Sequence, residues 1–355
     1  MILQFLNKKN SLRQLSDQQF EDIVENLAEE LYHIDYKHSY DNQNLHKDWL
    51  KLCEYDVSSY RHNGTAIGIG KHSSSTVRVG MKLCEHFFPN YFKIKNNKGV
   101  SFENSWTKEN LVKVLKWNRK SHSTPYLSEL RRGIYFCCGL TKNTMYRPHL
   151  AKSICFRQNL TISNPVVLDP CCGWGGRLLG TLAKNQKYIG FEPNEETFEN
   201  LNRMLSFLNI DKSRYQLYCD GAENIPNYDF EKVHLVLTSP PYFNLEIYSD
   251  SEKQSENMFT TYEDWRDKWL FPVIQNCLDR LYEYGSSAWN VHDIGKMKLI
   301  SDVYDYHKKQ EWEHTYDIGL TSPKRQSNDK THKKKNSDLT RIFEKGPSTR
   351  DYYYE

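Results

Sequence analysis

The sequence contains nine Cys but no C-x-x-C pair, and it lacks long apolar runs. Closely paired cysteines are typical of structural zinc sites, and regularly spaced cysteines in short secreted chains are typical of disulfide frameworks. Without either pattern, we expect reduced intracellular thiols and no metal site. No window approaches a membrane span, and the opening stretch MILQFLNKKN has too short an apolar run for a signal peptide. The sequence therefore predicts a cytoplasmic protein with no membrane partner.

The chain also lacks an excess of charge of one sign. Its 48 Lys and Arg residues nearly balance 45 Asp and Glu residues, and the formal net charge is +3. This balance allows nucleic acid as a partner, but any surface that binds phosphates has to be local. Aromatic residues are abundant at 14%, and 24 of them are Tyr. A high Tyr content is compatible with base stacking, although most tyrosines simply fill partly wet cores.

The pattern of apolar and turn-forming residues changes along the chain. The first part predicts helices, one of which opens with a capping box at Ser16 and another of which follows Thr107. From about residue 165, strand patterns alternate with helix patterns, which is typical of a doubly wound α/β sheet. We therefore expect a mainly helical region over residues 1–143 and an α/β domain over residues 144–348. The predicted helices lie near 177–185, 195–209 and 262–284, the last interrupted at Pro272. Stretch 61–80 is predicted to be a plain surface loop, with a loop that faces nucleic acid as the alternative. The predicted strands are PVVLD, KYIGFE, YQLYCD, HLVLT, SSAWNVHD and LTRIFEK.

A glycine-rich turn follows the first predicted strand. The stretch VVLDPCCGWGGRLLG places Asp169 at the strand end and three glycines, Gly173, Gly175 and Gly176, before a helix. Glycines there let the backbone turn sharply and approach a ligand at the carboxyl end of a strand. The G-x-G-G spacing differs from the G-x-G-x-x-G fingerprint of dinucleotide binding, which argues against NAD.

Two more acids end the next two predicted strands, Glu192 and Asp220. An acid at the place of Glu192 accepts hydrogen bonds from ribose hydroxyls in nucleotide-binding sheets, and Asp220 could accept one from an adenine amino group. Three carboxylates would repel phosphates, so they favour an adenosine ligand that has none. This indicates S-adenosylmethionine rather than ATP or NAD. Each acid taken alone is equally consistent with a loop cap.

The fourth predicted strand runs into the tetrapeptide SPPY, Ser239 to Tyr242. Proline cannot donate to a sheet ladder, so the chain leaves the sheet here as a stiff, extended segment. The Ser239 hydroxyl and the carbonyls around Pro240 are then fixed acceptors. Acceptors that hold both protons of a nucleobase amino group would free its lone pair to attack a methyl group in line. Tyr242 would stack on a base that has left its helix; a Pro-Pro turn at a sheet edge is the alternative.

The sequence resembles the DNA amino-methyltransferases, which carry a [DNS]-P-P-[YFW] tetrapeptide and a D-P-x-x-G-x-G turn. The matching segments here are SPPY (Ser239, Pro240, Pro241, Tyr242) and DPCCGWG, from Asp169 and Pro170 to Gly175. The turn precedes the tetrapeptide, as in the alpha and gamma groupings. The strings GWGGRLLG and SPPYFNLEIYS are similar to segments of phage-encoded DNA methyltransferases. The resemblance also implies a role in restriction-modification. The resemblance covers residues 144–346 and implies a Rossmann-like class I methyltransferase sheet that uses S-adenosylmethionine.

The resemblance also implies roles for single residues. The stretch TMYRPHLAKSI is similar to the segment that closes over the methionine end of the cofactor. Ser at the first tetrapeptide position is frequent, but not exclusive, among cytosine-N4 enzymes, so cytosine N4 and adenine N6 both stay open as targets. Cytosine-C5 chemistry is disfavoured because it needs a Pro-Cys nucleophile after the fourth strand. The implied cofactor-binding residues are Tyr146, Arg147, Pro148, Asp169, Pro170, Gly173, Gly175, Glu192 and Asp220, and the catalytic residues are Ser239, Pro240, Pro241 and Tyr242.

Basic residues indicate where DNA would bind. The N-terminal region is the favoured place for target recognition, although it contains no recognisable DNA-binding motif, and a Lys-rich insertion precedes the last strand. A solvated surface is the alternative for each cation. Other open functions are amino-group methylation of RNA, methylation of a glutamine side chain in a protein, and a non-catalytic nucleic-acid-binding partner subunit. The candidate DNA contacts are Arg119, Arg131, Arg132, Lys324, Arg325, Lys333 and Lys334.

Overall fold

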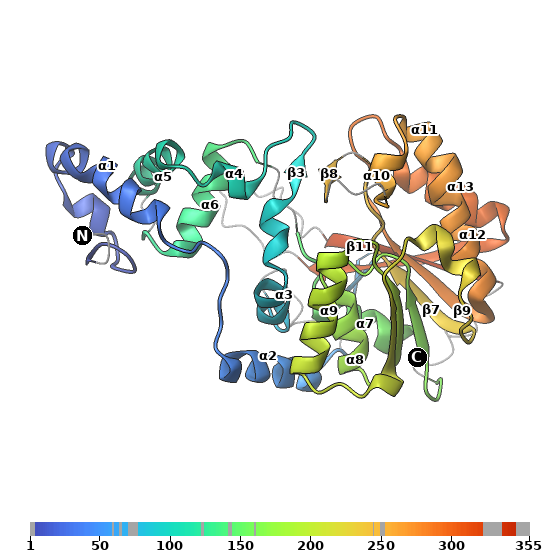
Figure 1. The fold of residues 1–355 in the computed structure, drawn as a ribbon. Coiled ribbons are helices and arrows are strands. Elements are labelled where there is room, and N and C mark those ends of the chain that lie inside the picture. The colour runs from blue at the N-terminus through green and yellow to red at the C-terminus, as the bar shows by residue number, and fades with distance from the viewer. Residues whose placement is uncertain are drawn as a thin grey trace. The chain divides into compact units, whose positions relative to one another are not determined.

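The computed structural model describes residues 4–58, 60–63, 66–69, 77–121, 124–140, 144–159, 161–243, 245–248, 253–321 and 336–345. The chain forms two compact units (Figure 1). The first, here named the helical unit, consists of Met1–Ser39, Pro89–Thr144 and Asn244–Ser249. The second, named the sheet unit, consists of Tyr40–Phe88, Met145–Phe243 and Asp250–Glu355. Residues 40–88 thus pack with the sheet although they lie within the predicted helical region.

The sheet unit contains a mixed sheet with nine strands in the described residues. Five neighbouring strands, β6, β5, β4, β7 and β9, run parallel. Strand β11 lies antiparallel between β9 and β10. These strand directions confirm the predicted α/β, Rossmann-like sheet. In spatial order the strands are β1 (Tyr60–Asn63), β2 (Ala66–Ile69), β10 (Trp312–Thr321), β11 (Asn336–Lys345), β9 (Leu281–Asn290), β7 (Val233–Thr238), β4 (Val166–Asp169), β5 (Lys187–Phe191) and β6 (Tyr215–Tyr218).

Helices cover both faces of this sheet. Val166 and Leu168 of β4 pack in one apolar cluster with α12 (Phe271–Arg280) and α13 (Leu299–Lys309). Val167, which points to the other face, packs in a cluster with α7 (Pro148–Gln158). Parallel strands covered on both faces are apolar throughout, as β4 is. The cluster around Tyr188 of β5 adds α2 (Asn42–Glu54), α3 (Met81–Phe87), α8 (Gly176–Ala183) and α9 (Glu195–Phe207).

Three segments of the sheet unit differ from the predictions. The predicted surface loop 61–80 is wrong in part, because β1 and β2 form an antiparallel pair there and β2 joins β10. Strand β10 itself was not predicted. The predicted helix 262–284 ends at Arg280, where the chain passes directly into β9. Pro272 does not interrupt the helical run from Tyr262 to Arg280, which continues without a break through a π-helical turn directly before the proline. The shorter elements here are α10 (Ser255–Met258), α11 (Tyr262–Trp265), η4 (Lys212–Arg214), η5 (Ala222–Asn227) and a π-helical turn η6 (Arg266–Leu270).

The helical unit has its own core, to which Phe20, Leu115 and Ile134 contribute. The predicted capping box is confirmed, because Ser16 and Gln19 exchange hydrogen bonds of 2.9 and 3.2 Å. Thr107 likewise caps α5. No helix in the described residues is long and apolar enough to cross a membrane. The elements of this unit are η2 (Ser11–Gln14), α1 (Asp17–Tyr32), η3 (Pro89–Lys93), β3 (Lys95–Asn96), α4 (Phe102–Ser105), α5 (Lys108–Lys120), α6 (Leu127–Cys137) and β8 (Glu246–Ile247), which pairs with β3.

Candidate active site

Four predicted site segments meet at one edge of the sheet, which we name the carboxyl edge. Strands β6, β5, β4 and β7 are parallel neighbours, so they end on the same side. Asp169 ends β4, Glu192 and Asp220 follow β5 and β6 closely, and Ser239 follows β7. The glycine turn contacts the next strand directly, because the Cys172 N–H donates to the Phe191 carbonyl at 2.9 Å.

Asp169 lies inside the protein, with no exposed surface. The Arg177 Nε and the Tyr188 hydroxyl each donate to its Oδ2 at 2.7 Å. Arg177 also donates to the carbonyl of Cys171 within the turn. Burial alone would lower the pKa of Arg177, but Asp169 and Tyr188 outweigh it and raise this pKa above its usual value. The carboxylate of Asp169 therefore orders the turn from within, which makes it a positioning residue.

Two glycines of the turn have backbone angles that other residues avoid. Gly173 and Gly175 have φ angles of 53° and 72°. A Cβ at position 175 would lie 2.7 Å from a methyl carbon of Met204. At Gly176 a Cβ would collide with the carbonyl oxygen of Tyr146. The glycines thus bring the start of α8 against the segment Tyr146–Pro148, which is predicted to lie near the same ligand.

Glu192 is nearly buried, and two backbone donors hold its carboxylate. The N–H of Gly173 lies 2.9 Å from Oε2, and the N–H of Asn194 lies 3.0 Å from Oε1. Burial raises the pKa of Glu192 to about 7, although both backbone hydrogen bonds act to lower it. This carboxylate therefore titrates near neutral pH.

Asp220 differs from Glu192 in its exposure and in the direction in which its pKa is shifted. It is partly exposed, and it accepts hydrogen bonds from Asn224 at 2.9 Å and from the Tyr228 hydroxyl at 2.8 Å. Burial acts to raise the pKa of Asp220, but these bonds and the Gly221 N–H outweigh it, so the net pKa is lowered. Asp220 is therefore ionised at neutral pH. The ring of Tyr228 also packs 4.4 Å from that of Tyr218, centroid to centroid, so an aromatic wall adjoins this acid.

The tetrapeptide leaves β7 at the carboxyl edge, as predicted. Pro240 is buried, whereas Ser239, Pro241 and Tyr242 are partly exposed. The Tyr242 hydroxyl donates to Asn290, with its carbonyl oxygen at 3.1 Å and its Oδ1 at 3.3 Å, and lies 3.4 Å from the Ser239 Oγ. The end of β9 therefore fixes the direction of the Tyr242 ring.

The residue after the tetrapeptide has a strained backbone. Phe243 has a φ angle of 51°, a left-handed conformation that costs a non-glycine residue roughly 1–2 kcal/mol. Its ring is buried and lies near Tyr262 and Trp265, with centroids 6.1 and 6.0 Å away. Packing of the ring thus holds a sharp turn directly behind SPPY.

A chain of polar contacts connects the tetrapeptide with the glycine turn. Asn290 Nδ2 donates to the Leu339 carbonyl at 3.0 Å and lies 3.4 Å from the Thr340 Oγ1, which lies 2.9 Å from the Tyr146 hydroxyl. The guanidinium of Arg177 stands 5.1 Å from the centre of the Tyr146 ring. Sequence reasoning missed Asn290, although it ends a parallel strand just as the predicted acids do. It also missed Thr340, Arg177 and Tyr188, for which the sequence carries no comparable signal.

The remaining residues that are predicted to bind a cofactor lie near this series of polar contacts. Arg147 donates to the carbonyl of Val77 at 2.7 Å. Pro148 is buried at the start of α7, close to Gly80. Pro170 is buried beside Asp169. Among the described residues, no cluster of His, Cys, Asp and Glu could hold a metal ion.

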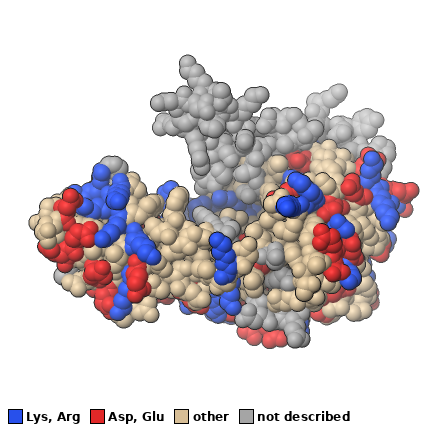
Figure 2. All heavy atoms as spheres, turned by 90° about the horizontal axis from the view of Figure 1, so that it is seen from above, with Lys and Arg blue, Asp and Glu red and all other residues tan. Residues whose placement is uncertain are grey.

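The arginines predicted to bind DNA have internal partners in the helical unit. Arg119 donates to Asp17 at 2.8 Å and to the carbonyls of Leu12 and Leu15 at 3.1 and 2.9 Å. Arg131 donates to the Tyr36 carbonyl at 2.9 Å, and Arg132 is exposed. On the face that Figure 2 shows, Lys and Arg side chains alternate with Asp and Glu side chains over this unit. Lys324, Arg325, Lys333 and Lys334 lie outside the described residues.

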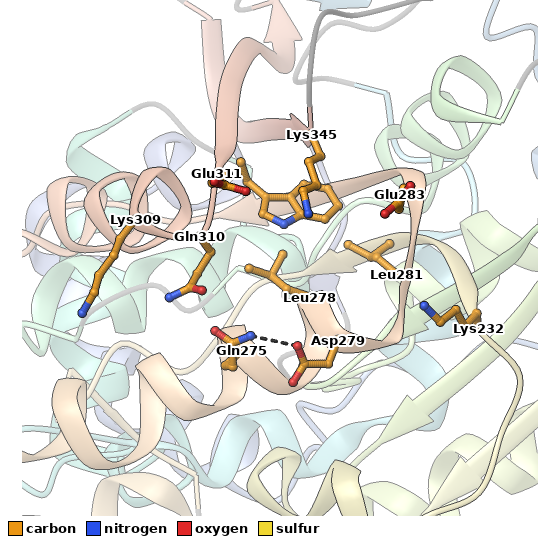
Figure 3. Close-up of a pocket in the computed structure, with 11 residues that line it drawn as sticks. Lys232, Gln275, Leu278, Asp279, Leu281, Glu283, Lys309, Gln310, Glu311 and Lys345 are labelled. Atoms are coloured by element: carbon orange, nitrogen blue, oxygen red, sulfur yellow. Dashed lines mark hydrogen bonds between the residues drawn. The ribbon is translucent and has the colours of Figure 1, made fainter.

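A cavity of about 440 Å³ lies at the opposite edge of the sheet (Figure 3). It is formed where β9 and β10 begin, near Leu281 and Trp312. Three lysines line it, Lys232, Lys309 and Lys345, and three acids balance them, Asp279, Glu283 and Glu311. None of the predicted site residues borders this cavity.

No protein-family model matches the sequence, and no curated relative matches it. Among solved structures, an rRNA methylase from Streptococcus thermophilus has 17% identity and a TM-score of 0.35 over 57% of this chain and 99% of its own. A Streptococcus mutans protein in complex with SAH has 20% identity and a TM-score of 0.36 over 56% and 99%. A SAM-dependent O-methyltransferase from Thermotoga maritima has 11% identity and a TM-score of 0.37 over 59% and 70%. Similarities this distant assign no activity to the chain.

Proposed function

We propose that the protein transfers a methyl group from S-adenosylmethionine to an exocyclic amino group in DNA, at cytosine N4 or adenine N6. One observation carries this proposal: the SPPY segment follows β7 at the edge where the glycine turn, Glu192 and Asp220 also lie. This edge offers acceptors for an amino group and acids for an adenosine ligand side by side. The DNA substrate rests on the resemblance of these two motifs to DNA amino-methyltransferases.

Two carboxylates at the carboxyl edge suit the methyl donor. Glu192 would accept hydrogen bonds from the ribose hydroxyls, and Asp220 would accept one from the adenine amino group. An ionised Asp220 disfavours a phosphate-bearing ligand, since like charges repel. The segment Tyr146–Pro148 would lie near the methionine end. When bound, S-adenosylmethionine supplies an electrophilic methyl group on a sulfonium.

The tetrapeptide would prepare the amino group for attack. Ser239 Oγ and a backbone carbonyl of the diproline segment would accept hydrogen bonds from the two amino N–H groups, which makes the nitrogen lone pair available. The nitrogen would then form a bond to the methyl carbon as the carbon–sulfur bond of the donor breaks with its electron pair going to sulfur, and the one surplus amino proton would pass to water. Tyr242, whose hydroxyl is held by Asn290, would stack on the extruded base.

Product identification tests this function. The full chain is incubated with S-adenosylmethionine and duplex DNA, single-stranded DNA or RNA, and the nucleic acid is then digested to nucleosides for mass spectrometry. We expect N4-methylcytosine or N6-methyladenine in DNA, and loss of the product in Ser239→Ala. Methylation of RNA alone would contradict the DNA substrate, and no binding of S-adenosylmethionine would contradict the enzyme class.

A further inference from the structure

An exposed aromatic cluster lies on the helical unit, and the proposed reaction does not use its residues. Phe136 of α6 is 67% exposed, the largest fraction among the exposed large apolar side chains in the described residues. Its ring stacks with Trp117 of α5 at a centroid distance of 5.7 Å and an interplanar angle of 17°. The Arg132 guanidinium stands 5.9 and 5.8 Å from the two ring centres. We name Trp117, Arg132 and Phe136 the stacking cluster.

A glycine allows the two helices to form this cluster. A Cβ at Gly133 would lie 3.2 Å from the Trp117 ring, tighter than most carbon contacts. Gly133 thus lets α6 approach α5 closely, so that Phe136, one turn further on, lies beside Trp117. The Trp117 and Phe136 rings thus pack against each other, and the Phe136 side chain stays largely exposed to water.

Lysines of α5 lie around the cluster and keep their charge unpaired. Lys113 and Lys120 stand four residues before and three residues after Trp117, which places them on the same face of the helix. Both are exposed, and neither forms an ion pair with any described residue; Lys113 donates to Asn110 at 3.1 Å. Arg132 of the cluster lies 3.4 Å from the Glu129 carboxylate.

Three other cations of α5 behave differently. Lys108 pairs with Glu29, Lys116 pairs with Glu21 at 2.8 Å, and Arg119 pairs with Asp17 at 2.8 Å. These acids all belong to α1, so these three cations are neutralised within the unit. Lys113 and Lys120 are not neutralised in this way by the described residues, so they are open to an anion.

We propose that the stacking cluster, with Lys113 and Lys120, binds a single-stranded segment of DNA. An unpaired base would stack on Phe136 and Arg132, and the two lysines would contact the adjoining phosphates. A flat apolar ring rimmed by cations fits a base with its phosphate, whereas a protein partner would need a larger apolar area. The choice of DNA over RNA rests on the proposed function. In duplex DNA the bases are stacked and out of reach, so the cluster selects opened or single strands.

Fluorescence anisotropy with a labelled oligonucleotide tests this proposal, using the full chain without a methyl donor. We expect Phe136→Ala to weaken binding of single-stranded DNA roughly 5- to 150-fold, as for the loss of one stacked base. Lys113→Ala with Lys120→Ala should lower the slope of log affinity against log salt by about 1.4, since each phosphate contact on a single strand adds roughly 0.7. Lys108→Ala with Lys116→Ala, the matched control at two lysines of the same helix that are paired with acids, should leave the slope unchanged.

Several outcomes would overturn the proposal. They are equal affinity of Phe136→Ala and the original protein, an equal loss in the control pair, or tighter binding of RNA than of DNA. Self-association that Phe136→Ala abolishes would assign the cluster to a second copy of the chain instead. Failure of methyl transfer with intact binding would refute the proposed function alone, because this assay needs no reaction. Circular dichroism of each variant checks that the helices remain folded.

Discussion

The two edges of the sheet differ in how their charged groups are held. At the carboxyl edge, Asp169 is buried against Arg177, the pKa of Glu192 is raised to about 7, and Phe243 has a strained backbone. At the opposite edge, a cavity of about 440 Å³ is lined by lysines and acids that balance one another (Figure 3). The carboxyl edge, with its perturbed groups, has the features of a reactive site, whereas the cavity at the opposite edge borders none of the predicted site residues.

The largest expected effect comes from breaking the buried ion pair of the carboxyl edge. Arg177→Met should lower the free energy of unfolding by about 3–5 kcal/mol, because it leaves the Asp169 carboxylate buried without its cation. Urea unfolding measures this change. Lys232→Met at the opposite edge is the matched control and should change the free energy by less than about 0.5 kcal/mol. Similar losses in both variants would remove the distinction between the edges.

Tyr242 is expected to affect turnover far more than cofactor binding. Tyr242→Ala should lower kcat about 100-fold while the affinity for S-adenosylmethionine changes little, because the ring would position the base and not the cofactor. Steady-state kinetics and equilibrium binding separate the two quantities. Tyr284→Ala, on the opposite end of the same strand that holds Asn290, should leave both unchanged.

Asn290 offers a sharper form of the same test. Asn290→Ala removes the amide that reaches the Tyr242 hydroxyl and Thr340, but it leaves the ring in place. We therefore expect a smaller fall in kcat than in Tyr242→Ala. An equal loss of kcat and cofactor affinity in either variant would contradict a role in positioning the base.

Glu192 should make cofactor binding depend on pH. Ribose hydroxyls donate to the ionised carboxylate, so affinity for S-adenosylmethionine should rise between pH 6 and pH 8, by up to about tenfold for a pKa near 7. The folding stability of the protein without a bound cofactor should change with pH in the opposite direction. Because the folded pKa lies above the unfolded value, the folded state binds more protons, and stability falls as pH rises from about 4.5 to about 7.

Isothermal calorimetry in buffers of different ionisation enthalpy would detect the proton released on binding near pH 7. Glu192→Gln should abolish both the proton release and the pH dependence, whereas Asp220→Asn should weaken binding without removing either. A pH dependence that persists in Glu192→Gln would assign the titration to another group.

Much of the fold follows from local patterns in the sequence. The helix caps at Ser16 and Thr107 and the apolar strand β4 depend on neighbours within a few residues, and the structure confirms them. Strand β10 has the sequence WEHTYDIGLT, in which apolar and polar residues do not follow a clear strand pattern. It forms a strand because it pairs with β11, a partner that the local sequence does not reveal. The hairpin of β1 and β2 likewise depends on partners distant in the sequence.

By itself, the sequence determined which residues end the parallel strands, because glycine and proline act on the backbone directly. The direction in which each side chain points was decided only in the tertiary structure. Asp169 and Asp220 both stand at strand ends. Asp169 is buried and accepts hydrogen bonds from Arg177 and Tyr188, whereas Asp220 stays partly exposed to water. Arg119 donates to carbonyls more than a hundred residues away in the sequence, whereas Lys113 on the same helix donates to Asn110 and forms no ion pair with any described residue. The reason is that burial and charge pairing depend on groups that are close only after folding.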